Sequence, residues 1–224
     1  FVAQLYMEKN SFAEAETCIK EAIELDSNNL EARYLRIKLY LNTGHETEAF
    51  SEYTNVSKIL VTQKAFDQAI KAYEAALQLI PSNTKIRRLL IELLIKLDRK
   101  SEAMKELQDL ADIHIQEGSK DNALLVYQQA IKLDPTNLPL RLKALTLAKG
   151  IAPQQENVSE YLKLAELYFD KGDAKIGEQL TIEVFHIAPT GISSNKLLLS
   201  LLQRCISSKK LFKYYFYLIE YFNN

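Results

Sequence analysis

The sequence contains few residues that break helices and lacks tryptophan altogether. Among 224 residues there are 6 glycines and 5 prolines. This scarcity disfavours a many-stranded sandwich, in which turns recur every ~8–12 residues, and favours long helices. The 2 cysteines, Cys18 and Cys205, make neither a disulfide framework nor a zinc knuckle. No apolar run approaches the ~18 residues of a membrane span, so we expect a soluble, helical protein in a reducing, cytoplasmic compartment.

The sequence also lacks an excess of charge of either sign. Its 28 Lys and Arg balance 29 Asp and Glu, for a net charge of −1, which disfavours a nucleic-acid partner. The three histidines, His45, His114 and His186, lack the spacing of metal ligands. There is no glycine-rich phosphate loop, nucleophile elbow or His-Glu helix motif. We therefore predict that the chain is not an enzyme and binds no metal or cofactor.

What the sequence does have is an internal repeat with a constant 54-residue period. One series of small residues has this spacing: Ala15, Ala69, Ala123 and Gly177. Pro81, Pro135 and Pro189 follow the same period. A second spacing lies within the first, because Ala49 and Ala103 divide the first two intervals into 34 and 20. The value of 34 is the period of a tetratricopeptide repeat.

Individual residues strengthen this comparison. Leu110, Ala111, Gly118, Ala123, Tyr127, Ala130 and Pro135 occur in one copy, and Leu164, Ala165, Tyr168, Gly172 and Pro189 in the next. In these residues the chain resembles the tetratricopeptide repeat family. The resemblance implies an all-α fold, a right-handed α-solenoid of antiparallel helices. It also implies that small residues such as Ala76 and Ala130 are buried at close helix crossings.

The 20-residue spacing departs from the plain family pattern. It is 14 short of the 34 in a full repeat and leaves no room for another loop and helix. We therefore predict that 102–117 is one helix, which closes one repeat and opens the next, and that 46–63 and 155–171 do the same. Each 54-residue unit then holds three helices, for example 84–97, 100–117 and 120–133. Residues missing from the chain at each junction are the disfavoured alternative.

The domain organisation follows from the repeat. We expect one repeat domain over 1–224, with units at about 1–29, 30–83, 84–137 and 138–191 and a C-terminal helical pair at 192–224. A helix over about 208–222 is rich in aromatic residues, and Tyr214, Tyr217 and Tyr221 extend its apolar arc. Since the outer face of a terminal repeat is normally polar, we predict that these tyrosines meet a partner, a second copy of the chain or further repeats. The alternative is that they line the edge of the array.

Local signals predict helix starts and packed side chains. Ser11 with Glu14, Ser101 and Asp173 have the pattern of N-caps. His114 occupies a position where the family usually has an aromatic side chain, so packing is favoured over a catalytic or ligand role. The two cysteines are expected to be buried free thiols.

The resemblance also implies a binding surface. In the family, groove contacts come from the inner helix of each pair, one turn apart. Carried over, the candidates are Tyr34, Lys38, Arg88, Glu92, Gln108, Asp112, Leu162 and Glu166. The chaperone-binding members grip a terminal carboxylate with a Lys/Asn/Arg set that is not assembled here, which disfavours chaperone C-termini as partners. Plain solvated surface is the alternative for all eight residues.

These patterns predict a non-catalytic scaffold or adaptor that binds a protein or peptide partner. The alternative is a regulatory or targeting segment of a larger enzyme, which a chain beginning at Phe1 rather than Met leaves open. RNA binding by helical repeats needs a basic groove, and the sequence shows none.

Overall fold

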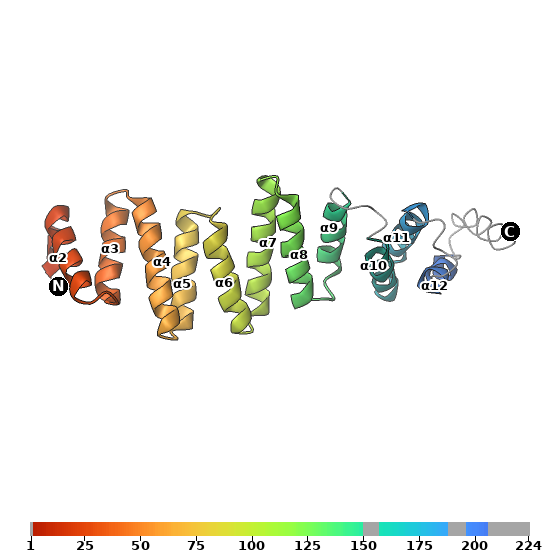
Figure 1. Ribbon diagram of the computed structural model, residues 1–224, viewed down its shortest axis with the longest axis horizontal. Helices are drawn as coiled ribbons and strands as arrows, with labels where there is room; N and C mark the ends of the chain where they lie inside the picture. Colours follow the sequence, from red (N-terminus) through yellow and green to blue (C-terminus); the bar gives the residue numbers. More distant parts are fainter. Residues whose placement is uncertain (1, 150–156, 188–195, 206–224) are drawn as a thin grey trace. The chain divides into compact units, whose positions relative to one another are not determined.

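The computed structural model describes residues 2–149, 157–187 and 196–205, and this part of the chain contains twelve α-helices and no strand (Figure 1). The helices are α1 (Val2–Glu8), α2 (Phe12–Leu25), α3 (Leu30–Asn42), α4 (Glu46–Thr62), α5 (Phe66–Leu79), α6 (Thr84–Lys96), α7 (Lys100–Gln116), α8 (Lys120–Leu133), α9 (Leu138–Ala148), α10 (Val158–Asp170), α11 (Ala174–Ile187) and α12 (Lys196–Cys205). The predicted helix over about 208–222 lies outside the described residues.

The helices confirm the predicted period. The first residues of α2, α5, α8 and α11 are Phe12, Phe66, Lys120 and Ala174, which follow the 54-residue spacing. The starts of α3, α6 and α9, at Leu30, Thr84 and Leu138, have the same spacing. α4 and α7 are unbroken helices of 17 residues, which confirms that one helix closes a repeat and opens the next. The third predicted helix, 155–171, is shorter, because α10 begins at Val158 and has 13 residues, and 155 and 156 lie outside the described residues. The structural unit is therefore a 54-residue segment of three helices.

The chain divides within α7 into two compact units, residues 1–113 and 114–224. In the first unit, α1 to α5 each pack on the next helix in the sequence, and successive helices from α2 to α6 run in opposite directions (Figure 1). In the second unit, α8 packs on α9, α9 on α10, α10 on α11, and α12 on both α10 and α11. The all-α architecture of consecutively packed helices is thus confirmed. That residues 1–224 form a single domain stays a prediction.

Small side chains lie where helices approach each other. Ala76 is fully buried and Ala130 is 1% exposed, as predicted. Ala15, Ala69 and Ala123 are also fully buried. Gly177 occupies the equivalent position in the fourth copy. A Cβ atom added to Gly177 would lie 2.8 Å from the Phe169 ring, which is too close for an ordinary contact. The crossing of α10 and α11 therefore requires glycine where the other copies accept alanine.

The turns after the helices repeat as well. Asn10, Lys64, Gly118 and Gly172 follow the 54-residue period, and all have positive φ. After α4, the amide of Ala65 donates to the carbonyl oxygen of Leu60 at 2.9 Å. This bond is typical of an α-helix that ends with one residue, here Lys64, in the left-handed conformation. Lysine thus occupies a backbone conformation that favours glycine.

The structure corrects the predicted helix caps. Ser11 makes no side-chain cap bond, and Ser101 lies inside α7. Instead, Asn29, Asn83 and Asn137, which also follow the repeat period, cap α3, α6 and α9 by accepting from the amide three residues on, at 2.9–3.1 Å. At Ser11 ψ is 70°, compared with 96° at Asn29, and the less extended backbone does not aim the side chain at the first free amides of the helix. At Asp173 the bond to the amide of Ile176 is long, 3.4 Å.

Candidate partner-binding site

A repeated ion pair positions the helices that carry the candidate residues. Arg33, Arg87 and Arg141 occupy equivalent positions of the repeat, and each pairs with a glutamate of the following helix, Glu52, Glu106 or Glu160. Each arginine also donates to the carbonyl oxygen six residues earlier, in the turn before its helix. These Arg–Glu pairs join α3 to α4, α6 to α7 and α9 to α10. The sequence analysis missed them, although the 54-residue spacing of both partners was a signal.

The pairs in the first unit are largely withdrawn from solvent. Arg87 is 7% exposed and Glu52 is 4% exposed. Glu52 also pairs with Arg36. Burial raises the pKa of Glu106, although the charge of Arg87 acts in the opposite direction. An arginine that is buried and bonded in this way holds its helix in one orientation, because its loss would leave a carboxylate without a partner.

In the first unit, the structure exposes all six candidate residues. Tyr34 is 42% exposed, and Lys38, Arg88, Glu92, Gln108 and Asp112 are likewise exposed. They form three pairs, one helical turn apart, on α3, α6 and α7. Arg87 is buried, whereas the next residue of α6, Arg88, is exposed. We call these six residues the α3/α6/α7 surface.

Aromatic side chains border this surface. Tyr73 of α5 is 4% exposed, and burial followed by the charge of Glu92 raises the pKa of its phenol. Burial, and then the neighbouring Tyr53, raises the pKa of Tyr34. The charge of Glu92 thus lies near the buried phenol of Tyr73, and the exposed Tyr34 lies near Tyr53.

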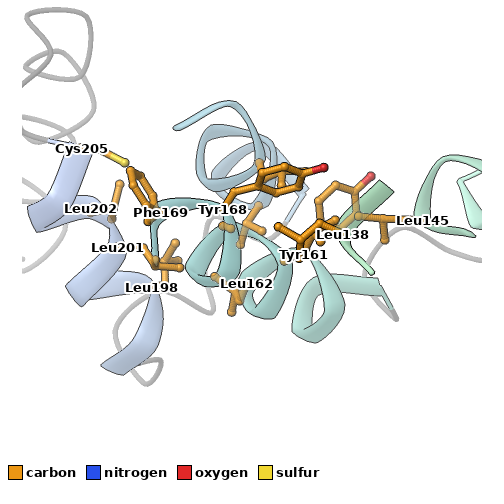
Figure 2. Close-up of a cluster of buried hydrophobic side chains, with 14 residues drawn as sticks. Leu138, Leu145, Tyr161, Leu162, Tyr168, Phe169, Leu198, Leu201, Leu202 and Cys205 are labelled. Atoms are coloured by element: carbon orange, nitrogen blue, oxygen red, sulfur yellow. The ribbon is translucent and has the colours of Figure 1, made fainter. Parts of the chain in front are cut away.

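The second unit differs from the prediction. Leu162 is 2% exposed and belongs to the core cluster of that unit, together with Leu198 and Leu201 of α12 (Figure 2). Because α10 contacts α12 as well as α9 and α11, this face of α10 is covered, and Leu162 does not lie on a binding surface. Glu166 is half-buried. Tyr214, Tyr217 and Tyr221 lie outside the described residues.

Of the side chains considered as catalytic groups or metal ligands, His114 and Cys205 are buried. His114 is 6% exposed, and its Nδ1 lies 3.3 Å from Glu117 Oε2, which agrees with a packing role. Cys205 is buried, whereas Cys18 is half-buried, and both thiols are free. Among the described residues, no group of three or more His, Cys, Asp or Glu side chains is arranged to hold a metal ion. None of the described helices combines the length and apolar character needed to cross a membrane.

Consecutively packed helices that recur every 54 residues define a helical repeat protein. Comparison with family models indicates which kind of repeat is present. Tetratricopeptide repeat models match residues 60–114, and residues 1–29 and 107–137. Over these residues the chain therefore contains tetratricopeptide repeats. No curated protein sequence matches it.

Comparison with solved structures finds proteins with low sequence identity to this chain. BtubC from P. vanneervenii is 14% identical, with 81% of this chain and 91% of that chain covered and a TM-score of 0.35. The C-terminal part of a repeat protein from Cytophaga hutchinsonii is 13% identical, with 90% and 98% covered and a TM-score of 0.28. At these identities and TM-scores the likenesses say nothing about what this chain binds.

Proposed function

We propose that the chain is a non-catalytic scaffold that binds a partner protein or peptide through the α3/α6/α7 surface. One observation carries the proposal: six exposed residues form three one-turn pairs on helices that buried Arg–Glu pairs hold in place. A rigid scaffold loses little conformational freedom when a partner binds, so more of the contact energy contributes to affinity.

The chemistry of this surface favours a partner of mixed charge. Lys38 and Arg88 are basic, whereas Glu92 and Asp112 are acidic. Charges of both signs give specificity by matching opposite charges on a partner and repelling like charges. Tyr34 adds an aromatic contact of the kind that is enriched in interfaces. A partner that presents both acidic and basic side chains fits this arrangement best.

The proposal includes a cytoplasmic location, which the two free thiols favour. It also keeps a second contact as a prediction, self-association through Tyr214, Tyr217 and Tyr221. Glu166 remains a candidate in the second unit, whereas Leu162 does not, because its side chain is buried.

The proposal is tested by affinity capture with mass spectrometry. The bait is the parent chain or the double variant Arg88→Glu/Asp112→Lys, which reverses two charges of the surface and leaves the net charge unchanged. The matched control is Lys20→Glu/Glu24→Lys, which reverses an exposed i, i+4 pair on α2. We expect the parent and the control to retain a common partner and the double variant to lose it, with equal melting temperatures for all three. Retention of that partner by a folded double variant would place the binding site elsewhere.

A further inference from the structure

We propose that a pocket at the turn between α3 and α4 binds a basic side chain, arginine or lysine, of the partner. This inference rests on the proposed function, because it specifies part of the chemistry of the partner. The turn lies at one edge of the first unit, where α3 ends and α4 begins (Figure 1). None of the residues that line the pocket belongs to the α3/α6/α7 surface.

The pocket combines aromatic and acidic walls. It has a volume of about 420 Å³, and its lining includes Phe12, Glu16, Tyr40, His45 and Glu48. The rings of Tyr40 and His45 are 6.4 Å apart, tilted by 57°. The Nδ1 atom of His45 lies 2.7 Å from the hydroxyl of Thr43, so the imidazole has a defined position. Aromatic faces and carboxylates both attract cations.

The pocket residues lie within 12–48, which we call the first copy, and the equivalent residues one period later lie within 66–102, the second copy. In the second copy, basic side chains of the chain itself occupy the place that corresponds to the pocket. Arg99 stands one repeat period after His45, and its guanidinium bonds both carboxylate oxygens of Glu102 at 2.7 and 2.6 Å. A third bond, of 3.0 Å, joins Arg99 to Asp67. In addition, the ammonium of Lys96 lies 5.3 Å from the centre of the Phe66 ring. In the second copy, therefore, Arg99 binds the carboxylates of Glu102 and Asp67, and Lys96 lies over the ring of Phe66.

In the first copy the acid and the ring remain, but the two cations are absent. Phe12 corresponds to Phe66, and Glu48 to Glu102. His45 replaces the arginine, and Asn42 replaces Lys96.

One acid is exchanged for another, because Ala13 stands where the second copy has Asp67, and Glu16 stands where it has Ile70. The first copy therefore retains the ring of Phe12 and the carboxylate of Glu48, has Glu16 as its second carboxylate in place of Asp67, and leaves a cavity where the second copy places its own basic side chains.

The carboxylate of Glu48 is suited to this role. A bond from the Thr47 hydroxyl, 2.8 Å long, is the main cause that lowers the pKa of Glu48. The group is therefore ionised at neutral pH. A guanidinium has the geometry to form two parallel bonds with one carboxylate, as Arg99 does with Glu102 in the second copy.

The test is a nuclear magnetic resonance titration of the ¹⁵N-labelled chain with N-acetyl-arginine amide. The control ligand is N-acetyl-citrulline amide, which has nearly the same shape and no charge. We expect saturable shifts of the Gly44, Thr47 and Glu48 amides with the arginine derivative, and at least about tenfold weaker binding of the citrulline derivative, since charge-assisted bonds are about twice as strong as neutral ones. Equal binding of the two ligands, or no shift with arginine, overturns the proposal.

Two variants make the test specific to the pocket. His45→Arg introduces the arginine of the second copy, so we expect it to occupy the pocket from within, weaken binding at least about tenfold and leave the melting temperature unchanged or higher. Glu46→Gln removes an exposed charge that does not line the pocket, and it should bind as the parent does. Unchanged binding by His45→Arg overturns the proposal.

Because the ligand is a single amino-acid derivative, these results do not depend on the partner. A negative titration rejects the pocket alone, whereas the capture experiment with Arg88→Glu/Asp112→Lys tests the scaffold function.

Discussion

Arg87 of α6 pairs with Glu106 of α7, and its other terminal nitrogen donates to the carbonyl oxygen of Pro81 at 2.9 Å. One side chain thus joins a turn, the helix after it and the next helix. The same three-part contact recurs at Arg33 and Arg141. Because the side chain of Arg87 is 8% exposed, removing it would leave Glu106 half-buried without its main partner.

We expect Arg87→Ala to lower the free energy of unfolding by about 3–5 kcal/mol, the usual cost of breaking a buried pair by removing one partner. The control is Lys85→Ala, at an exposed position of the same helix, which should change the free energy by less than about 0.5 kcal/mol. Urea unfolding monitored by circular dichroism measures both. Equal effects of the two substitutions would mean that the buried pair does not hold α6 against α7.

Lys64→Gly should stabilise the chain. Lys64 has a φ of 59°, and the equivalent turns have Gly118 and Gly172. The left-handed conformation costs a non-glycine residue about 1–2 kcal/mol, and part of that cost is offset by the greater freedom of glycine in the unfolded state. A net gain of about 0.5–1 kcal/mol follows, seen as a rise in melting temperature.

Lys71→Gly, within α5, is the control, and it should lower the melting temperature because glycine is unfavourable inside a helix. If Lys64→Gly lowers stability as much as Lys71→Gly, the backbone at residue 64 is not left-handed.

Gly177→Ala should destabilise the second unit, although alanine stands at the same position in the other three copies. The added Cβ would lie 2.8–2.9 Å from three atoms of the Phe169 ring, and such overpacking costs about 1–3 kcal/mol. Adding Phe169→Leu should recover part of the loss, because the smaller side chain vacates that space. A melting temperature for Gly177→Ala equal to that of the parent contradicts the close crossing of α10 and α11.

The two cysteines should differ in reactivity. Burial raises the pKa of the Cys205 thiol to about 11, and the residue is fully buried. At pH 8 its reactive thiolate is then only about a thousandth of the population, whereas Cys18 is half-buried. Iodoacetamide on the native chain should label Cys18 first, as measured by mass spectrometry of peptides. Denaturation should equalise the two rates, and faster native labelling of Cys205 would contradict its burial.

The sequence predicted the helices well because their signals are local and occur repeatedly. The 54-residue period placed a helix over 102–117, and α7 is Lys100–Gln116. The caps were predicted less well, since serine at a helix start caps only where the backbone aims its hydroxyl. The three side chains that cap are all asparagines, with ψ of 96°, 92° and 87°, whereas ψ is 70° at Ser11.

The candidate surface depended on contacts that no repeat pattern specifies. Gln108 and Leu162 occupy equivalent positions, yet Gln108 is exposed and Leu162 is buried, because α12 packs on α10. The Arg–Glu pairs, by contrast, follow the repeat and were within reach of the sequence. Residues with the same spacing therefore predict shared contacts inside the repeat, but exposure depends on neighbours farther along the chain.

The central claim, that the α3/α6/α7 surface binds a partner, is tested most directly by the dissociation constant of the captured partner. Isothermal titration calorimetry would compare the parent chain, Arg88→Glu/Asp112→Lys and Lys20→Glu/Glu24→Lys. We predict binding at least about tenfold weaker for the first variant, a loss of about 1.4 kcal/mol or more, and an unchanged constant for the second. Equal dissociation constants for all three folded proteins would contradict the claim.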